Sequence, residues 1–271
     1  MHLQFKSTSQ LNRQNQSRHI LITRPIEVAS EFETYLQAHL FEMSVFASID
    51  VQPLTDYQQV DRILQSDRVY DYLILTSSNG AKYLQHRAQA LSLSLPERFQ
   101  STQIAVVGPQ TASVLQQLGL AVAIIPAQHH SQALAQALSQ FDLKNKRILS
   151  LRSQIARPEL IHDLAAAGAL IDDVPIYTTL KAKPADLSPL RQSLSEGVFA
   201  AIAFASASSV RYFASYFEPQ DLASYLQKTL IASIGPMTSQ ACLESLGRVD
   251  IEANPHTMMG LAQSLVQELA L

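Results

Sequence analysis

The sequence predicts an α/β protein with two similar domains, each built on a parallel sheet with helices on both faces. The first observation is a repeated motif, since residues 106–111, Val-Val-Gly-Pro-Gln-Thr, return at residues 233–238 as Ser-Ile-Gly-Pro-Met-Thr. The second is that residues 76–84 match residues 205–213 at nearly the same offset. The third is the alternation of short apolar runs with segments of helical period, which is typical of parallel sheets covered by helices. Together they indicate a tandem internal repeat of one β/α unit.

Strand and helix signals follow one another through the first half of the chain. Residues 1–17 are rich in Gln, Ser and Asn without a period, and predict a flexible tail. Strands are expected at residues 19–23, 44–51, 72–76, 104–107 and 121–125. Helices are expected after Pro25, over 56–66, after 77–80, over 112–118 and over 132–138, with 96–101 as a surface connection. Thr111 is the expected N-cap of the helix over 112–118.

The second half repeats this pattern and leaves one question open. Strands are expected at residues 147–151, 171–177, 201–204 and from 231, and helices over 158–166, after 206–209, after 235–238 through Cys242 to Gly247, and over 259–269. The two copies could fold one after the other, or the first strand-helix-strand of each could pack with the remainder of the other. Residues 51–55 and 174–179 are extended, Pro-containing stretches where the chain could cross twice.

Composition limits the classes of function. The 271 residues are 47% hydrophobic, which is enough for two cores, and the formal net charge of −3 argues against general nucleic-acid binding. Cys242 is the single cysteine, and its place on an apolar helix face predicts a buried structural thiol. The sequence contains no apolar run of membrane-spanning length and no apolar signal-peptide core, so we expect a cytoplasmic protein that binds no membrane.

The segments after the predicted strands are dense in Ser, Thr, Gly and Asn, as at residues 76–80, 108–111, 206–209 and 235–238. Ligands of open α/β sheets bind beyond the carboxyl ends of strands, where helix starts present unpaired N–H groups. These loops predict a binding surface for carboxylates or phosphates. The alternative is that the hydroxyls only cap helices.

Metal, nucleotide and hydrolase signals are weak or missing. His129 and His130 are adjacent, and no third ligand is spaced to complete a zinc site with them. The sequence has no Gly-x-Gly-x-x-Gly, no P-loop and no Gly-x-Ser-x-Gly motif. We therefore expect no cofactor and no metal.

Several short motifs, taken in order, resemble those of uroporphyrinogen-III synthases from about Ile20 to the C-terminus. They are Thr-Ser-Ser-Asn-Gly (76–80), Val-Gly-Pro-x-Thr-Ala (107–112), Val-Pro-Ile-Tyr-Thr-Thr (174–179), Phe-Ala-Ser-Ala-Ser-Ser-Val (204–210), Ile-Gly-Pro-x-Thr (234–238) and Pro-His-Thr-x-x-Gly-Leu (255–261). The resemblance implies a cyclising lyase that closes hydroxymethylbilane to uroporphyrinogen III, with inversion of ring D and loss of water. It also implies the exchanged arrangement, in which residues 18–53 and 178–271 form one α/β domain, residues 54–177 the other, and a two-stranded linker joins them.

The same resemblance assigns roles to individual residues. Tyr177 matches the tyrosine that assists departure of the hydroxyl group, although it could instead be a linker tyrosine packed under the hinge. Thr111 and Thr238 match threonines associated with substrate binding, with helix capping as the competing role. The implied carboxylate contacts are Ser77, Asn79, Ser206 and Ser208. Arg24 and Arg152 are the expected charge partners, with Arg157 a further candidate that could equally be solvated.

The resemblance further implies a monomer without cofactor that acts in tetrapyrrole biosynthesis, in haem and sirohaem formation. A transient contact with hydroxymethylbilane synthase, which makes the unstable substrate, would fit this role. The alternative from another class is a two-lobed module that binds or senses a small anion without changing it.

Overall fold

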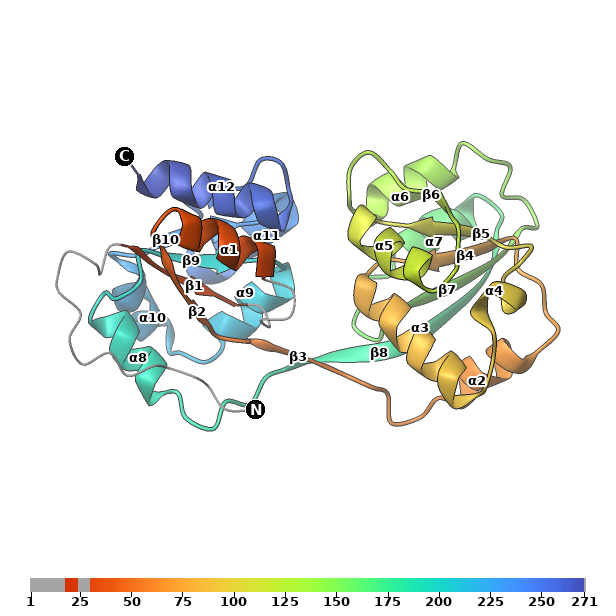
Figure 1. Cartoon of the computed structure of the whole chain (residues 1–271), viewed down its shortest axis with the longest axis horizontal. Helices are drawn as coiled ribbons and strands as arrows, with labels where there is room; N and C mark the ends of the chain where they lie inside the picture. The colour runs from red at the N-terminus through yellow and green to blue at the C-terminus, as the bar shows by residue number, and fades with distance from the viewer. Residues whose placement is uncertain (1–17, 24–29, 271) are drawn as a thin grey trace. The chain divides into compact units, whose positions relative to one another are not determined.

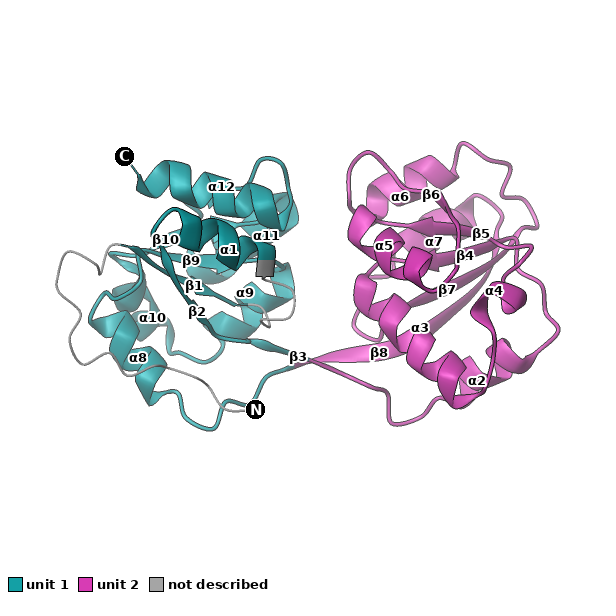
Figure 2. Ribbon diagram, viewed as in Figure 1, with its two compact units in different colours: residues 1–50, 181–271 teal, residues 51–180 magenta. Residues whose placement is uncertain are grey.

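The chain divides into two compact units. The computed structural model describes residues 18–23 and 30–270. Residues 1–50 and 181–271 form unit 1, and residues 51–180 form unit 2 (Figure 2). The expected tail and Arg24 lie outside the described residues. In the described part of the chain, no helix has the length and apolar character needed to cross a membrane.

Unit 1 contains a parallel sheet whose described strands follow the order β11-β10-β9-β1-β2 (Figure 1). The strands are β1 (His19–Ile22), β2 (Glu42–Val45), β9 (Ala201–Phe204), β10 (Leu230–Ser233) and β11 (Ile251–Glu252). The helices are α1 (Ser30–Ala38), α8 (Ser188–Ser195), α9 (Ala207–Ala214), α10 (Pro219–Leu226), α11 (Pro236–Leu246) and α12 (Met258–Leu269). Strands from both ends of the chain therefore share one sheet.

Unit 2 contains the second sheet, with the order β3-β8-β7-β4-β5-β6. The strands are β3 (Ile49–Gln52), β4 (Tyr72–Leu75), β5 (Gln103–Val106), β6 (Val122–Ile124), β7 (Arg147–Ser153) and β8 (Leu170–Lys181). The helices are α2 (Gln58–Gln65), α3 (Ser78–Ala90), α4 (Leu95–Arg98), α5 (Pro109–Gln117), α6 (Ser131–Leu138) and α7 (Glu159–Ala166). β8, β7, β4, β5 and β6 pair in parallel.

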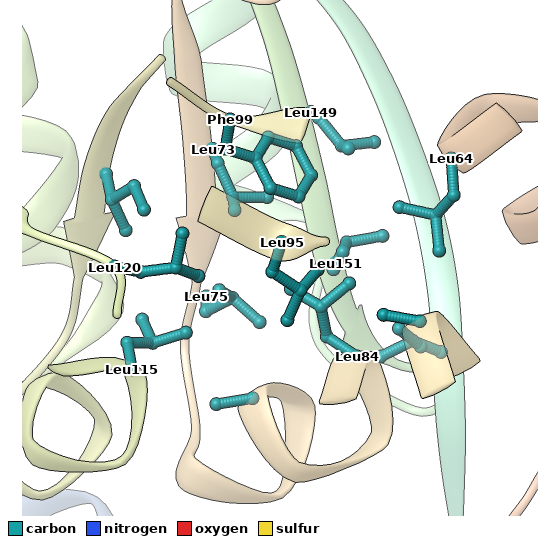
Figure 3. Packing of buried hydrophobic residues seen from close by; sticks show 14 of the residues in the cluster. Leu64, Leu73, Leu75, Leu84, Leu95, Phe99, Leu115, Leu120, Leu149 and Leu151 are labelled. Atoms are coloured by element: carbon teal, nitrogen blue, oxygen red, sulfur yellow. The ribbon is translucent and has the colours of Figure 1, made fainter. Parts of the chain in front are cut away.

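Each sheet is buried on both faces, because successive strand residues point to opposite sides. In β4, Leu73 and Leu75 join the cluster under α2, α3, α4 and α5, while Tyr72 and Ile74 join the cluster under α6 and α7. Figure 3 shows the first of these clusters, with Leu84 of α3, Leu115 of α5 and Leu149 of β7 packed around the strand residues. In β9 the same alternation separates two further clusters.

The chain crosses between the units in β3 and returns in β8, and these two strands are neighbours in the sheet order. The amide of Ala182 donates to the carbonyl of Ser48 at 3.1 Å. At the unit 2 end, the Tyr83 hydroxyl donates to the carbonyl of Val51 at 3.2 Å and the Tyr57 hydroxyl to that of Ile176 at 3.1 Å. Backbone and tyrosine hydrogen bonds therefore tie the two crossing segments to their surroundings.

Three local predictions were wrong. The strand expected over 44–51 is interrupted, because Phe46 turns into the core and the buried Ser48 hydroxyl bonds to the carbonyls of Thr23 and Ser209. The expected surface connection at 96–101 contains most of α4. Helix α5 starts at Pro109, with Gly108 in the N-cap position, so Thr111 does not cap it. Proline at the first helical position needs no N–H partner, which explains the earlier start.

Candidate active site

Tyr177 lies in β8 and is 6% exposed. Its hydroxyl forms a 2.8 Å hydrogen bond with Oγ of Ser77. Burial raises the pKa of Tyr177 from its ordinary value of 10.0, and hydrogen bonds to Ser77 and Ser153 oppose that shift. The phenol therefore stays protonated at neutral pH, where it can donate a hydrogen bond.

The sheet of unit 2 brings the partners of Tyr177 together. Ser77 follows β4 and caps α3, with its Oγ accepting from the amide of Gly80 at 3.1 Å. Ser153 ends β7, where a register irregularity after Arg152 places it opposite Tyr177. Because β4 and β7 are parallel neighbours, their carboxyl ends meet at one edge of the sheet. Both serines therefore reach the same phenol.

Tyr83 completes this cluster. Its ring stacks on that of Tyr177, with centroids 5.5 Å apart and an interplanar angle of 8°. Sequence reasoning missed Tyr83 and Ser153 as neighbours of the site. Tyr83 carried a signal, because it belongs to the repeated segment at 76–84 and has Tyr212 as its counterpart. Ser153 carried none, since the strand irregularity decides its position.

Each unit has a Gly-Pro loop in which a histidine packs on the glycine. A Cβ built on Gly108 would lie 3.4 Å from Cβ and Cγ of His129, and one built on Gly235 would lie 3.1 Å from Cγ of His256. Thr111 and Thr238 follow in the first turns of α5 and α11 and are 5% and 4% exposed. Neither threonine is the N-cap of its helix, so capping no longer competes with substrate binding.

The remaining predicted hydroxyl and amide contacts lie at helix starts. Ser206 caps α9 by accepting from the amide of Ser209 at 3.2 Å, and its Oγ also lies 3.2 Å from that of Ser208. Asn79 lies half-buried in the first turn of α3. Within unit 1 the structure therefore pairs Ser206 with Ser208, and within unit 2 it places Asn79 beside the cap formed by Ser77.

Arg152 has partners within unit 2. Its Nε donates to Asp173 Oδ1 at 2.6 Å and its second terminal nitrogen bonds the other oxygen, so the carboxylate balances its charge. A further nitrogen donates to the carbonyl of Ala156 at 2.7 Å. The guanidinium therefore holds the loop after β7, which carries the exposed Arg157. The expected contact of Arg152 with substrate stays a prediction.

His130 and Cys242 have structural surroundings. His130 caps α6, since its Nδ1 accepts from the amide of Ala133 at 3.1 Å. Cys242 is fully buried in α11, and burial raises its pKa to about 12. Over the described parts of both units, no three His, Cys, Asp or Glu side chains gather to hold a metal ion.

Comparison with known proteins identifies the family. The family model described as Uroporphyrinogen-III synthase HemD matches residues 30–263. The chain belongs to the uroporphyrinogen-III synthase family. It is 30% identical over 255 residues to the uroporphyrinogen-III synthase of Synechococcus elongatus, covering 92% of this chain and 94% of that protein. Identity to the uroporphyrinogen-III synthase of Chlorobaculum parvum is 25% over 234 residues, which cover 86% of this chain and 91% of the relative.

Solved structures of the uroporphyrinogen-III synthase family share the fold. The mutant enzyme from Thermus thermophilus superposes with a TM-score of 0.66 at 19% identity, covering 93% of this chain and 98% of that one. The Helicobacter pylori structure gives a TM-score of 0.63 at 18% identity, with coverage of 93% and 99%. The predicted family and the predicted α/β class with parallel sheets are thereby confirmed.

Two of the helix-capping serines, Ser77 and Ser206, separate two effects of one substitution. We expect Ser77→Ala and Ser206→Ala each to lower the free energy of unfolding by about 1 kcal/mol, because each removes an N-cap. Ser77→Ala also removes a partner of the Tyr177 hydroxyl, so it should lower kcat, whereas Ser206→Ala should mainly raise KM. Urea unfolding and steady-state kinetics measure the two effects. Equal effects on kcat would contradict a special role for Ser77.

Proposed function

We propose that this chain converts linear hydroxymethylbilane into uroporphyrinogen III, with inversion of ring D and loss of water, in tetrapyrrole biosynthesis that serves haem and sirohaem. Family membership supports the reaction, which is that of a cyclising lyase. The observation that carries the residue assignment is the buried Tyr177 hydroxyl bonded to the cap of α3. Such a phenol is a protonated, oriented donor at neutral pH.

The proposed first step is departure of the hydroxyl group of the substrate. Tyr177 donates a hydrogen bond to that oxygen, and the C–O bond breaks to leave an azafulvene cation on the terminal pyrrole. The Gly80 amide donates to Ser77, so the Ser77 hydroxyl hydrogen is free to turn toward the Tyr177 oxygen. The resulting row of donors stabilises negative charge that develops on the phenol as it gives up its proton.

The later steps depend mainly on conformation. The electron-rich pyrroles supply the electrons, as ring D attacks through its substituted carbon, and the resulting spiro intermediate fragments and recloses. We propose that the loops hold the acetate and propionate groups so that ring D presents this carbon. The residues assigned to these contacts are Arg24, Ser77, Asn79, Thr111, Arg152, Ser206, Ser208 and Thr238. Backbone amides at the starts of α3, α5, α9 and α11 would share this task.

We also propose that the enzyme is a cytoplasmic monomer that contacts hydroxymethylbilane synthase only transiently. Rapid transfer would limit spontaneous closure of the unstable substrate. Sedimentation of the enzyme alone and mixed with that synthase tests both statements. A stable complex or a defined oligomer would contradict them.

A coupled assay tests the activity. Hydroxymethylbilane is supplied by its synthase, and the products are separated as type I and type III isomers after oxidation. We expect type III from the complete reaction, and type I when this protein is omitted. A protein that only binds or senses the tetrapyrrole would leave type I as the product, and that outcome would favour the alternative function.

A further inference from the structure

A row of polar side chains runs through the loop edge of unit 1, beside the residues assigned above. His256 follows β11, and its Nε2 lies 3.5 Å from Oε1 of Glu252. The other Glu252 oxygen accepts a hydrogen bond from the Ser239 hydroxyl, whose Oγ lies 2.6 Å from that of Ser233. Ser233 is fully buried, whereas the His256 side chain is 53% exposed. The row therefore leads from the core of unit 1 to an exposed imidazole.

The contacts of His256 distinguish the two edges of its ring. A Cβ built on Gly235 would lie 3.1 Å from Cγ and 3.4 Å from Cδ2 of His256, so this edge packs on the Gly-Pro loop. Nδ1 lies on the other side of the ring. A carboxylate that faces Nε2 favours the tautomer with its hydrogen on Nε2, and the pair of lone electrons on Nδ1 is then available.

Unit 2 has the matching histidine without the acidic row. Ser233 of β10 lies next to Glu252 of β11 in the sheet of unit 1. In the repeat, Ser233 corresponds to Val106 at the end of β5, and Glu252 corresponds to Ile125, which follows β6. Ser239, the fourth residue of α11, corresponds to Ala112, the fourth residue of α5. His129 packs on Gly108 as His256 packs on Gly235. The packing is therefore common to both units, and the carboxylate with its two serines is specific to unit 1.

We propose that His256 is a proton-transfer residue of the cyclisation, and that Glu252 and Ser239 are its positioning residues. The inference rests on the proposed function. It gives the reaction a second residue that transfers a proton, in addition to Tyr177. His129 packs on Gly108 without a carboxylate at the position equivalent to Glu252. The packing of His256 on Gly235 therefore does not by itself explain why Glu252 is there. A histidine with one nitrogen facing a carboxylate, here at 3.5 Å, is a common arrangement for a side chain that accepts and returns a proton.

The reaction contains a step that needs such a group. When the free α-carbon of ring D forms the last carbon–carbon bond, it briefly carries both the new bond and its hydrogen. The C–H bond then breaks, its electron pair restores the pyrrole, and the proton passes to Nδ1 of His256. This released proton balances the one that leaves with the hydroxyl group as water. The substrate class is thus a pyrrolic carbon acid formed within the same cyclisation.

The experiment compares His256→Ala and His256→Gln with His129→Ala, using kcat and KM for type III formation by the full chain. We expect both His256 variants to lower kcat about tenfold or more with little change in KM, since positioned proton transfer contributes at least this much. Added imidazole should restore part of the rate of His256→Ala. His129→Ala should keep the wild-type kcat, and Glu252→Gln should lower kcat without rescue by imidazole.

Three outcomes are decisive. Reduced kcat with imidazole rescue supports the inference, and His256→Gln covers the case in which the alanine variant fails to fold. Wild-type kcat in both His256 variants, or a raised KM with unchanged kcat, overturns the inference while type III product leaves the proposed function standing. Type I alone from the wild-type protein overturns the proposed function and this inference with it.

Discussion

Replacing Tyr177 by phenylalanine is expected to lower the rate of type III formation by roughly tenfold or more, the lower end of what a positioned acid contributes. The substitution removes the hydroxyl that bonds to Ser77 and keeps the ring that stacks on Tyr83. The fold should therefore persist, and the loss should appear in kcat. Rates are measured with hydroxymethylbilane supplied by its synthase, with separation of the two isomers.

Tyr70 provides the matched control for this variant. It is also a buried tyrosine of unit 2, and its hydroxyl donates to Asp172 at 2.6 Å. Tyr70→Phe likewise removes one part-buried hydrogen bond of a phenol, here to a carboxylate, so it should lower stability by about 1.5–3 kcal/mol and leave kcat unchanged. If Tyr177→Phe and Tyr70→Phe turn over substrate at the same rate, Tyr177 is a packed linker tyrosine and its assigned role is wrong.

Replacing Gly260 by alanine is expected to disrupt the loop that carries His256. A Cβ on Gly260 would lie 1.9 Å from the carbonyl oxygen of Pro255 and 2.9 Å from its carbonyl carbon, so backbone must move. Alanine gains about 1 kcal/mol of helix propensity over glycine inside α12. The clash outweighs this gain, and we expect a net loss of about 1–3 kcal/mol in the free energy of unfolding. Type III formation should fall as well, because the loop is displaced.

Gly80 is the control for that substitution. Both glycines are the third residue of their helix and donate to the N-cap hydroxyl, Gly80 to Ser77 and Gly260 to Thr257. A Cβ on Gly80 would meet the end of the flexible Leu75 side chain at 3.1 Å, which can give way. Gly80→Ala should therefore shift the urea midpoint far less than Gly260→Ala. Equal shifts of the urea midpoint would show that the clash with Pro255 is not the cause of the destabilisation.

Residue patterns predicted the main helices and strands, because the buried face of each element requires apolar residues at regular spacing along the sequence. β4 and β9 are short, wholly buried strands, so their apolar runs were recognisable. The Gly-Pro motifs marked the ends of the preceding strands, but the structure shows that each proline is also the first residue of its helix. The same reasoning failed for Thr111, where capping propensity was preferred over the stronger signal of Pro109.

The candidate site was predictable only where one residue acts through local structure. The structure shows Ser77 and Ser206 as helix caps, a role the sequence offered because caps lie beside their helices, while their expected contacts with substrate stay predictions. Arg152 was expected as a charge partner of the substrate, and its pairing with Asp173 on the neighbouring strand was not foreseen, because sheet register sets it. Arg24 lies outside the described residues, so its predicted contact stays a prediction.

By itself, the sequence determined the α/β class, the recurring loop motifs and the family, because these depend on local propensity and on short motifs in a shared order. Only the tertiary structure decided which side chains meet, such as Ser153 with Tyr177, or Glu252 between Ser239 and His256. Pairing of distant strands sets these contacts, and a register irregularity or a polar residue on a neighbouring strand leaves no periodic trace in the sequence.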